Sequence, residues 1–266
     1  MTLRLTILGC GSSAGVPRVG QGWGACDPAN PRNRRRRCSV LMERFGAAGA
    51  TTVLVDTSPD LREQLIDAGL KRLDAVLMTH EHADHTHGID DLRPLVLSAG
   101  HRIDIHMDAP TSQVLRKKFA YIFETPDGSS YPPIAVEHRL EAGVSCRIEG
   151  TGGAIEAIPF DLDHGDTIAL GFRFGALAYT PDLKRIPAAS RAYLESLEVW
   201  IVDALRYRPH PSHFSLDDAL AEIEAMRPRR AILTNLHVDL DYATLMKRLP
   251  AHVVPAYDGM RVEGFD

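Results

Sequence analysis

Hydrophobic and polar residues alternate at the start of the chain, where Arg4 and Thr6 separate Leu3, Leu5 and Ile7. Alternation with period two predicts a half-buried β-strand. Further short apolar runs between turn-forming residues predict strands at Cys38–Glu43, Thr52–Asp56, Ala75–Met78, Ile103–Met107, Ile134–Glu137, Ala154–Pro159, Ile168–Phe174, Leu177–Thr180, Val199–Val202 and Ala231–Thr234.

Helices are predicted between and after these strands. Ser58-Pro59 has the residue types of a helix start, and Gly69 those of its end. The other helices are expected at Thr111–Phe123, Pro187–Glu195, Leu216–Met226 and Tyr242–Leu249. This mixture predicts an α/β protein whose two packed sheets are covered by helices. Since no repeat or low-complexity linker interrupts it, we predict one domain over residues 1–266.

The overall composition is that of a globular protein, with 44% hydrophobic and 24% charged residues. A formal net charge of −5 disfavours a general nucleic-acid binder, which is usually basic. We therefore expect no large nucleic acid as a partner. A phosphate-bearing substrate stays open, because bound metal ions add positive charge that the sequence formula omits.

No apolar run approaches the roughly 20 residues that span a bilayer. The segment Met1–Cys10 also lacks the apolar core and cleavage site of a signal peptide. We therefore expect a cytoplasmic protein with no membrane partner. The cysteines form no CxxC pair and are expected to stay reduced in that compartment.

A cluster of histidines carries the strongest chemical signal. His80, His82, Asp84 and His85 follow the predicted strand Ala75–Met78 directly. Imidazole and carboxylate are ligands of zinc and similar ions. In an extended segment His80 and His82 point to the same side, while Asp84 and His85 follow where the chain turns and can face a second ion. A solvated His-rich loop is the alternative interpretation.

The pattern HxHxDH after a strand resembles the signature of metallo-β-lactamase-fold hydrolases, and the resemblance extends over nearly the whole chain. It implies a four-layer αββα sandwich and two divalent metal ions, Zn²⁺ or Mn²⁺. Asp56 matches an acidic residue at the end of the preceding strand, for which the resemblance implies a hydrogen bond to a ligating histidine. A helix-start or turn aspartate is the alternative for Asp56.

Three later residues complete the metal ligands that this resemblance implies. His164 follows a predicted strand where the superfamily has its third histidine, and Asp182 matches the carboxylate between the two ions. The last ligand is irregular, because Asn235 stands where histidine is expected and His237 lies two residues further on. Both face the same side if the strand continues, so we predict His237 as the ligand. A weaker Asn or water ligand is the alternative.

Three segments resemble one branch of the superfamily, the PhnP-type phosphoribosyl cyclic phosphate phosphodiesterases, and more distantly the tRNA 3′-processing endonucleases. They are GCGSSAGVP at 9–17, NRRRRCS at 33–39 and SHFSL at 212–216. The resemblance implies a small phosphate-containing substrate, His213 beside the leaving group, and often a homodimer. A surface histidine before a helix is the equal alternative for His213. The acidic charge and the lack of a long exosite arm disfavour the tRNA enzyme.

The N-terminal loop departs from the PhnP type. Those proteins hold a structural zinc through a cysteine cluster and a late histidine, whereas this chain keeps only Cys26 and has Val238 at the late position. We therefore predict no structural zinc, and the natural substrate stays open. For Arg32 and the run Arg34–Arg37, solvated surface charge or ion pairs to acidic residues are favoured over phosphate binding.

The resemblance implies a phosphodiesterase mechanism around two ions. One ion is assigned to His80, His82 and His164, and the other to Asp84, His85 and His237, with Asp182 and a hydroxide shared between them. Asp84 would also orient the hydroxide, and His213 would protonate the leaving alkoxide. A carboxylic ester, thioester or lactone hydrolase is the first alternative. A non-catalytic nucleotide-binding protein of the same fold is the second.

Overall fold

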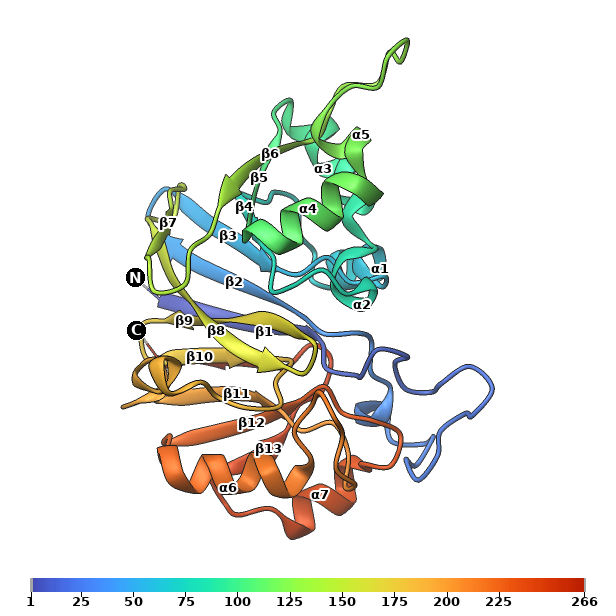
Figure 1. Cartoon of the computed structure of the whole chain (residues 1–266), viewed down its shortest axis with the longest axis vertical. Coiled ribbons are helices and arrows are strands. Elements are labelled where there is room, and N and C mark those ends of the chain that lie inside the picture. Colours follow the sequence, from blue (N-terminus) through green and yellow to red (C-terminus); the bar gives the residue numbers. More distant parts are fainter. Residues whose placement is uncertain (1, 266) are drawn as a thin grey trace.

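The computed structural model describes residues 2–265, which form two seven-stranded sheets packed face to face between helices (Figure 1). In spatial order the first sheet contains β14 (Arg261–Glu263), β1 (Thr2–Gly9), β2 (Ser39–Gly46), β3 (Gly49–Val55), β4 (Ala75–Leu77), β5 (Ile103–Met107) and β6 (Ala135–Arg139). The second contains β13 (Val253–Pro255), β12 (Arg230–Thr234), β11 (Val199–Asp203), β10 (Leu177–Thr180), β9 (Thr167–Phe174), β8 (Ile155–His164) and β7 (Cys146–Ile148).

Each sheet is antiparallel along one half and parallel along the other. In the first sheet, the pairs from β14 to β3 are antiparallel and those from β3 to β6 are parallel. In the second, the pairs from β7 to β10 are antiparallel and those from β10 to β13 are parallel. Parallel strands require crossover connections, and helices supply most of these.

Helices cover both outer faces. The first sheet carries α1 (Leu61–Asp67), α2 (Ala83–Thr86), α3 (Arg93–Ala99), α4 (Ala109–Lys118) and α5 (Ala120–Phe123), drawn in cyan and green in Figure 1. The second carries α6 (Leu216–Met226) and α7 (Tyr242–Arg248), drawn in orange and red. Three short 3₁₀ helices lie at Pro31–Asn33, Ile89–Leu92 and Ala188–Leu194. The predicted four-layer αββα sandwich is thereby confirmed.

The apolar core follows these layers. The central cluster joins inward-facing residues of both sheets, such as Ile7 and Val53 with Phe172 and Ile201, all fully buried. A second cluster lies between α6, α7 and the second sheet, and a third between the first sheet and α1, α4 and α5. Each fully buried aliphatic or aromatic side chain contributes about 1.5–3 kcal/mol.

Several element boundaries differ from the prediction. The first helix begins at Leu61, because the Ser58 hydroxyl donates to Gln64 and accepts the backbone N–H of Asp60 instead of capping a helix at Pro59. The predicted helix Thr111–Phe123 is divided at Phe119, whose φ of −132° is not helical. The segment Pro187–Glu195 contains a 3₁₀ helix instead of an α-helix. The short elements α3, β7, β13 and β14 were not predicted.

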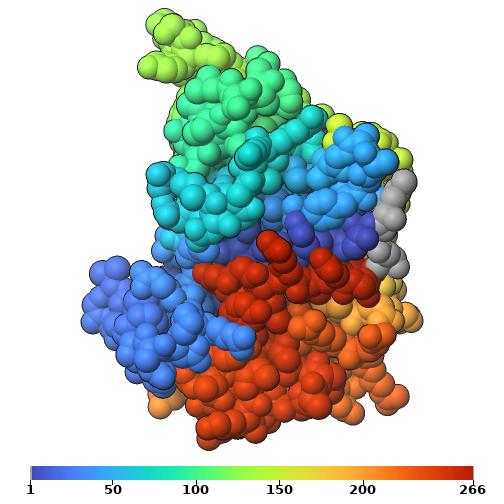
Figure 2. Space-filling model, turned by 180° about the vertical axis from the view of Figure 1, so that it is seen from behind, coloured from blue at the N-terminus to red at the C-terminus, as the bar shows by residue number. Residues whose placement is uncertain are grey.

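The N-terminal segment between β1 and β2 is fastened to the C-terminal part of the chain, beside which it lies in Figure 2. Arg35 is 1% exposed, and its guanidinium donates to the backbone oxygens of Leu240 at 2.8 Å and His237 at 3.4 Å. Asn33 donates to Asp241 at 2.8 Å. A buried guanidinium with these acceptors gives this long segment one fixed path.

Among residues 2–265, no helix combines the length and the apolar character that a membrane crossing requires.

Candidate metal centre

The candidate ligands follow strand ends of both sheets. The segment His80–His85 follows β4, and Asp56 follows β3 directly. In the second sheet His164 is the last residue of β8, and Asp182 lies two residues beyond β10. Side chains distant in the sequence are thus brought together at the edge where the two sheets meet.

Two groups of ligand atoms share Asp182. In each group the ligand atoms lie within 4.8 Å of one another. The first group is His80, His82, His164 and Asp182, and the second is Asp84, His85 and Asp182. The Asp182 Oδ2 atom lies 3.5 Å from His80 Nε2, 3.1 Å from His85 Nε2 and 3.7 Å from His164 Nε2. A carboxylate common to both groups suits two neighbouring cations.

Hydrogen bonds at the opposite ring nitrogens orient two of these imidazoles. Asp56 accepts the backbone N–H and the hydroxyl of Thr79, each at 2.8 Å, and contacts His85 Nδ1 at 2.7 Å. Since the Thr79 hydrogen points to Asp56, the Thr79 oxygen accepts from His80 Nδ1 at 2.9 Å. The Nε2 atoms of both histidines therefore face Asp182, as metal ligation requires.

The other two histidines complete the first group. His164 Nδ1 donates to the backbone oxygen of Ser212 at 2.7 Å, which leaves His164 Nε2 facing His82 Nδ1 at 3.3 Å. Burial lowers the pKa of His80 well below its usual value and also lowers that of His164. Both rings are therefore neutral at physiological pH, the form that binds metal ions.

The hydrogen bonding of His80 Nε2 and the protonation of its neighbours show whether these residues fit a cation. Among residues 2–265, His80 Nε2 is a buried side-chain nitrogen with no hydrogen-bond partner. Burial disfavours a charge on Asp182, but His85 and the other histidines hold its pKa well below the usual range. Burial likewise disfavours a proton on His85, yet Asp182, Asp56 and Asp84 raise its pKa well above normal. The neutral rings of His80 and His164 and the ionised carboxylate of Asp182 fit a divalent ion, which would take the place of the proton on His85.

His213 lies beside Asp182 in a third group with Asp203. His213 Nδ1 contacts Asp203 Oδ2 at 2.8 Å, and the His213 and His164 rings lie 4.6 Å apart. Burial by itself would lower the pKa of His213, but the charge and hydrogen bond of Asp203 raise it to about 9. Asp203 was not among the predicted site residues, although its carboxylate directly follows the predicted strand Val199–Val202.

The structure does not bring His237 into the ligand groups, which corrects its assignment to the second ion. His237 Nε2 contacts Arg18, and His237 Nδ1 contacts Asp239 at 3.0 Å. Instead Asn235, with a left-handed φ of 60°, turns its amide nitrogen to Asp182 at 3.0 Å. The prediction that both residues share one face failed because the strand β12 ends at Thr234.

A cavity of about 730 Å³ adjoins the second ligand group. Asp84 and His87 line one side of it, and Arg18 and Arg37 come from the N-terminal segment. Arg37 Nε is held by Asp60 at 3.0 Å. The cavity therefore presents two guanidinium groups beside a metal ligand.

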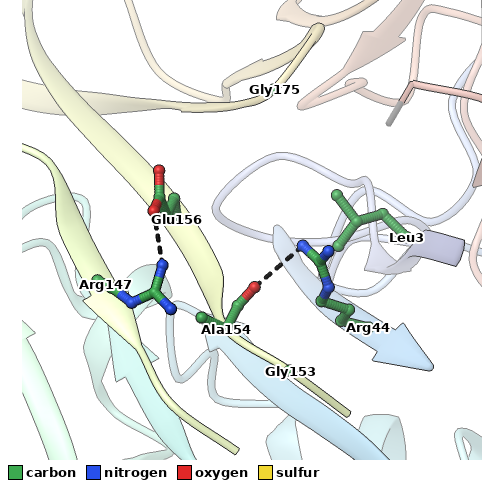
Figure 3. A pocket seen from close by; sticks show the side chains of 7 residues that line it. All are labelled: Leu3, Arg44, Arg147, Gly153, Ala154, Glu156 and Gly175. Atoms are coloured by element: carbon green, nitrogen blue, oxygen red, sulfur yellow. Dashed lines mark hydrogen bonds and ion pairs between the residues drawn. The ribbon is translucent and has the colours of Figure 1, made fainter. Parts of the chain in front are cut away.

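Another cavity, of about 530 Å³, contains none of the candidate ligands (Figure 3). Its charged groups contact neighbouring protein atoms: Arg147 donates to Glu156 at 2.8 Å, and Arg44 to the backbone oxygen of Ala154 at 3.0 Å. We therefore assign the chemistry to the cavity beside Asp84.

The arginines of the run Arg34–Arg37 have different surroundings. Arg35 is buried against the C-terminal segment, and Arg36 pairs with Asp67 and Asp258. Arg37 alone of this run lines the cavity beside Asp84.

Cys26 packs with Val16, Trp23 and Val238 in a small apolar cluster.

The comparisons with known proteins agree with this geometry. The family model of the β-lactamase superfamily domain matches residues 51–235. A solved structure described as a new diphosphatase from the PhnP family has a TM-score of 0.89 and 36% identity, covering 99% of this chain and 98% of that one. This chain belongs to the β-lactamase superfamily and, within it, to the PhnP family.

Two curated relatives match this chain over about half of their own length. An octanoyltransferase of Porphyromonas gingivalis is 32% identical over 262 residues, which are 97% of this chain and 51% of that protein. A ribonuclease Z of Bradyrhizobium diazoefficiens is 30% identical over 149 residues, 54% of this chain and 46% of that protein. This PhnP-family chain thus spans about half the length of the curated relatives it matches.

Proposed function

We propose that this protein is a dinuclear metal-dependent phosphodiesterase that acts on a small phosphate-bearing substrate, such as a cyclic ribose phosphate or a nucleotide. The observation that carries the proposal is the cavity that Arg18 and Arg37 line together with the candidate ligand Asp84. Guanidinium groups bind phosphate oxygens through paired hydrogen bonds, so this cavity suits an anionic substrate better than a neutral ester.

Different residues of the protein bind the substrate and donate the proton in this proposal. Divalent ions, when bound, neutralise charge on the phosphoryl oxygens and make water more acidic. Arg18 and Arg37 hold the anionic substrate, and Asp84 lies between their cavity and the ligand cluster. His213 carries a proton at Nε2 because Asp203 engages its Nδ1, so it acts as the general acid for the leaving oxygen.

The PhnP-family diphosphatase supports a phosphate substrate, since its description names diphosphate chemistry and it matches this chain over almost its full length. The octanoyltransferase of P. gingivalis favours a second candidate, hydrolysis of an acyl ester or thioester. Such carbonyl chemistry is also open to a dinuclear centre. That relative is about twice as long as the matched region, so its name need not describe this half.

The two candidates are separated by a substrate panel. Protein reconstituted with Zn²⁺ or Mn²⁺ is assayed against bis(p-nitrophenyl) phosphate, a ribose cyclic phosphate and a nucleoside diphosphate. The same protein is assayed against p-nitrophenyl octanoate, an octanoyl thioester and a lactone. Chelator-sensitive turnover confined to the phosphate substrates supports the proposal. Turnover confined to the acyl substrates selects the second candidate, and nucleotide binding without turnover in either set selects a binding protein.

A further inference from the structure

The two ligand groups around Asp182 differ in chemistry. The first offers three imidazoles and one carboxylate, whereas the second offers His85 as its one imidazole, with the carboxylates of Asp84 and Asp182. Imidazole-rich sites with four ligands suit zinc, and oxygen donors suit harder ions such as Mn²⁺ and Mg²⁺. The two positions therefore favour different ions and hold them with different strength.

Asn235 stands in the sequence where a histidine ligand of the second ion is expected, and its hydrogen bonds keep it from that role. It is 3% exposed, and its Nδ2 lies 3.0 Å from Asp182 Oδ1 and 3.2 Å from Asp203 Oδ1. An amide oxygen in that position would face two carboxylate oxygens, so the nitrogen must point there. An amide NH₂ is a donor group, and it has no lone pair to offer a metal ion.

No neighbouring histidine supplies the imidazole ligand that is missing at Asn235. His237 is held between Arg18 and Asp239, away from Asp182. His213 Nδ1 contacts Asp203 and lies 3.1 Å from Asn235 Nδ2, and His213 belongs with Asp203 and Asp182 to the third group. Within residues 2–265 the second group thus contains a single imidazole ligand.

We propose that the two ion positions are unequal and that Asn235 sets the difference. The position formed by His80, His82, His164 and Asp182 retains Zn²⁺. The position formed by Asp84, His85 and Asp182 exchanges its ion readily and accepts Mn²⁺. This inference rests on the dinuclear centre proposed above, but not on which substrate is hydrolysed.

Metal binding to the full chain tests the inference without any substrate. Protein stripped by a chelator is loaded with excess Zn²⁺, passed through gel filtration and analysed for metal by mass spectrometry. We expect one zinc ion per chain to remain. Mn²⁺ added to this one-zinc protein should then bind at one further position, followed by electron paramagnetic resonance and reversed by dilution.

Each other result of that titration has a definite meaning. Two zinc ions retained with equal affinity contradict the unequal positions, while they leave the dinuclear phosphodiesterase intact. Retention of no ion contradicts the proposed dinuclear centre itself. The two failures are therefore distinguishable.

Two variants locate the cause. Residues that only orient metal ligands already change metal affinity by about 10–100-fold. We therefore expect Asn235→His, which adds a ligand, to tighten the second ion by about tenfold or more, so that two zinc ions survive gel filtration. The matched control His237→Gln should leave both affinities unchanged. Loss of an ion in His237→Gln, or no gain in a folded Asn235→His, contradicts the assignment, and the wild-type titration stands if either variant fails to fold.

Discussion

The imidazole of His213 and the carboxylate of Asp203 form one unit, with His213 Nδ1 and Asp203 Oδ2 2.8 Å apart and Asp203 fully buried. Asp203 also accepts the backbone N–H of Leu183 at 3.2 Å, which fixes the carboxylate in place. The pair therefore delivers an oriented, protonated ring beside Asp182.

Replacing His213 by Gln should lower kcat about 10²–10⁴-fold, the usual contribution of a general acid. The metal content of the variant, measured by mass spectrometry after purification, should equal that of the wild type. Loss of a metal ion in His213→Gln would show that this histidine is a ligand instead.

The pH profile tests the role of Asp203. His213 must be protonated to act as an acid, and its pKa is raised to about 9, so kcat should fall as the pH rises through about 9. In Asp203→Asn the charge that raises this pKa is gone, and the fall should begin at lower pH. A structural role alone would reduce activity without moving this alkaline limb.

Much of the architecture could be predicted because the spacing of apolar residues along the chain indicates which side chains are buried. The helix Leu216–Met226 and the strand Leu177–Thr180 have their predicted bounds, since Ser215 forms a capping box with Asp218 and every residue of the strand is buried. The helix at Ser58-Pro59 was misplaced because the Ser58 hydroxyl bonds to the side chain of Gln64. The contact spans six residues, which is further than the residue-type rules for a helix start take into account.

The candidate site was predictable where ligands are close in sequence, as in His80–His85. The misassigned residue, His237, follows a strand by a few positions, where the direction of the chain depends on distant contacts. The left-handed conformation of Asn235 ends the alternation, and Arg18, more than two hundred residues earlier, holds the His237 ring. Sequence periodicity carries no information about this backbone conformation or about the contact between Arg18 and His237.

Asp56 orients His85 directly and His80 through Thr79. Asp56→Ala should therefore weaken metal binding about 10–100-fold, measured by competition with a chromogenic chelator. Asp74→Asn is the matched control, because Asp74 also accepts a backbone N–H, from Thr52 at 2.8 Å, but touches no ligating histidine. Equal metal affinity in both variants would remove the role given to Asp56.

Arg37 should affect substrate binding more than chemistry. Arg37→Gln is expected to raise KM for phosphate substrates about tenfold, since a charge-assisted hydrogen bond contributes roughly 1.5–3 kcal/mol, while kcat changes little. Arg34→Gln is the matched control, because exposed Arg34 belongs to the same run but does not line the cavity beside Asp84. Identical KM values for both variants would contradict the assigned cavity.

Asp241 fastens the N-terminal segment to α7. Its carboxylate accepts the backbone N–H of Thr244 at 2.8 Å, the Asn33 amide at 2.8 Å and the backbone N–H of Asp27 at 3.2 Å. Burial alone would raise the pKa of Asp241, but these hydrogen bonds lower it to about 2. We expect Asp241→Ala to lower the free energy of unfolding by about 1–3 kcal/mol at pH 7.

The pH dependence of that loss has a definite sign. Because the folded pKa lies below the ordinary value of 3.8, the stabilisation is complete above about pH 4 and is lost as the pH falls towards 2. Urea unfolding of wild type and Asp241→Ala should therefore differ most at neutral pH and converge in acid. The exposed Asp127→Ala serves as control and should match the wild type throughout. A difference between wild type and Asp241→Ala that stays constant from pH 7 to pH 2.5 would assign the effect to packing instead of the charged hydrogen bonds.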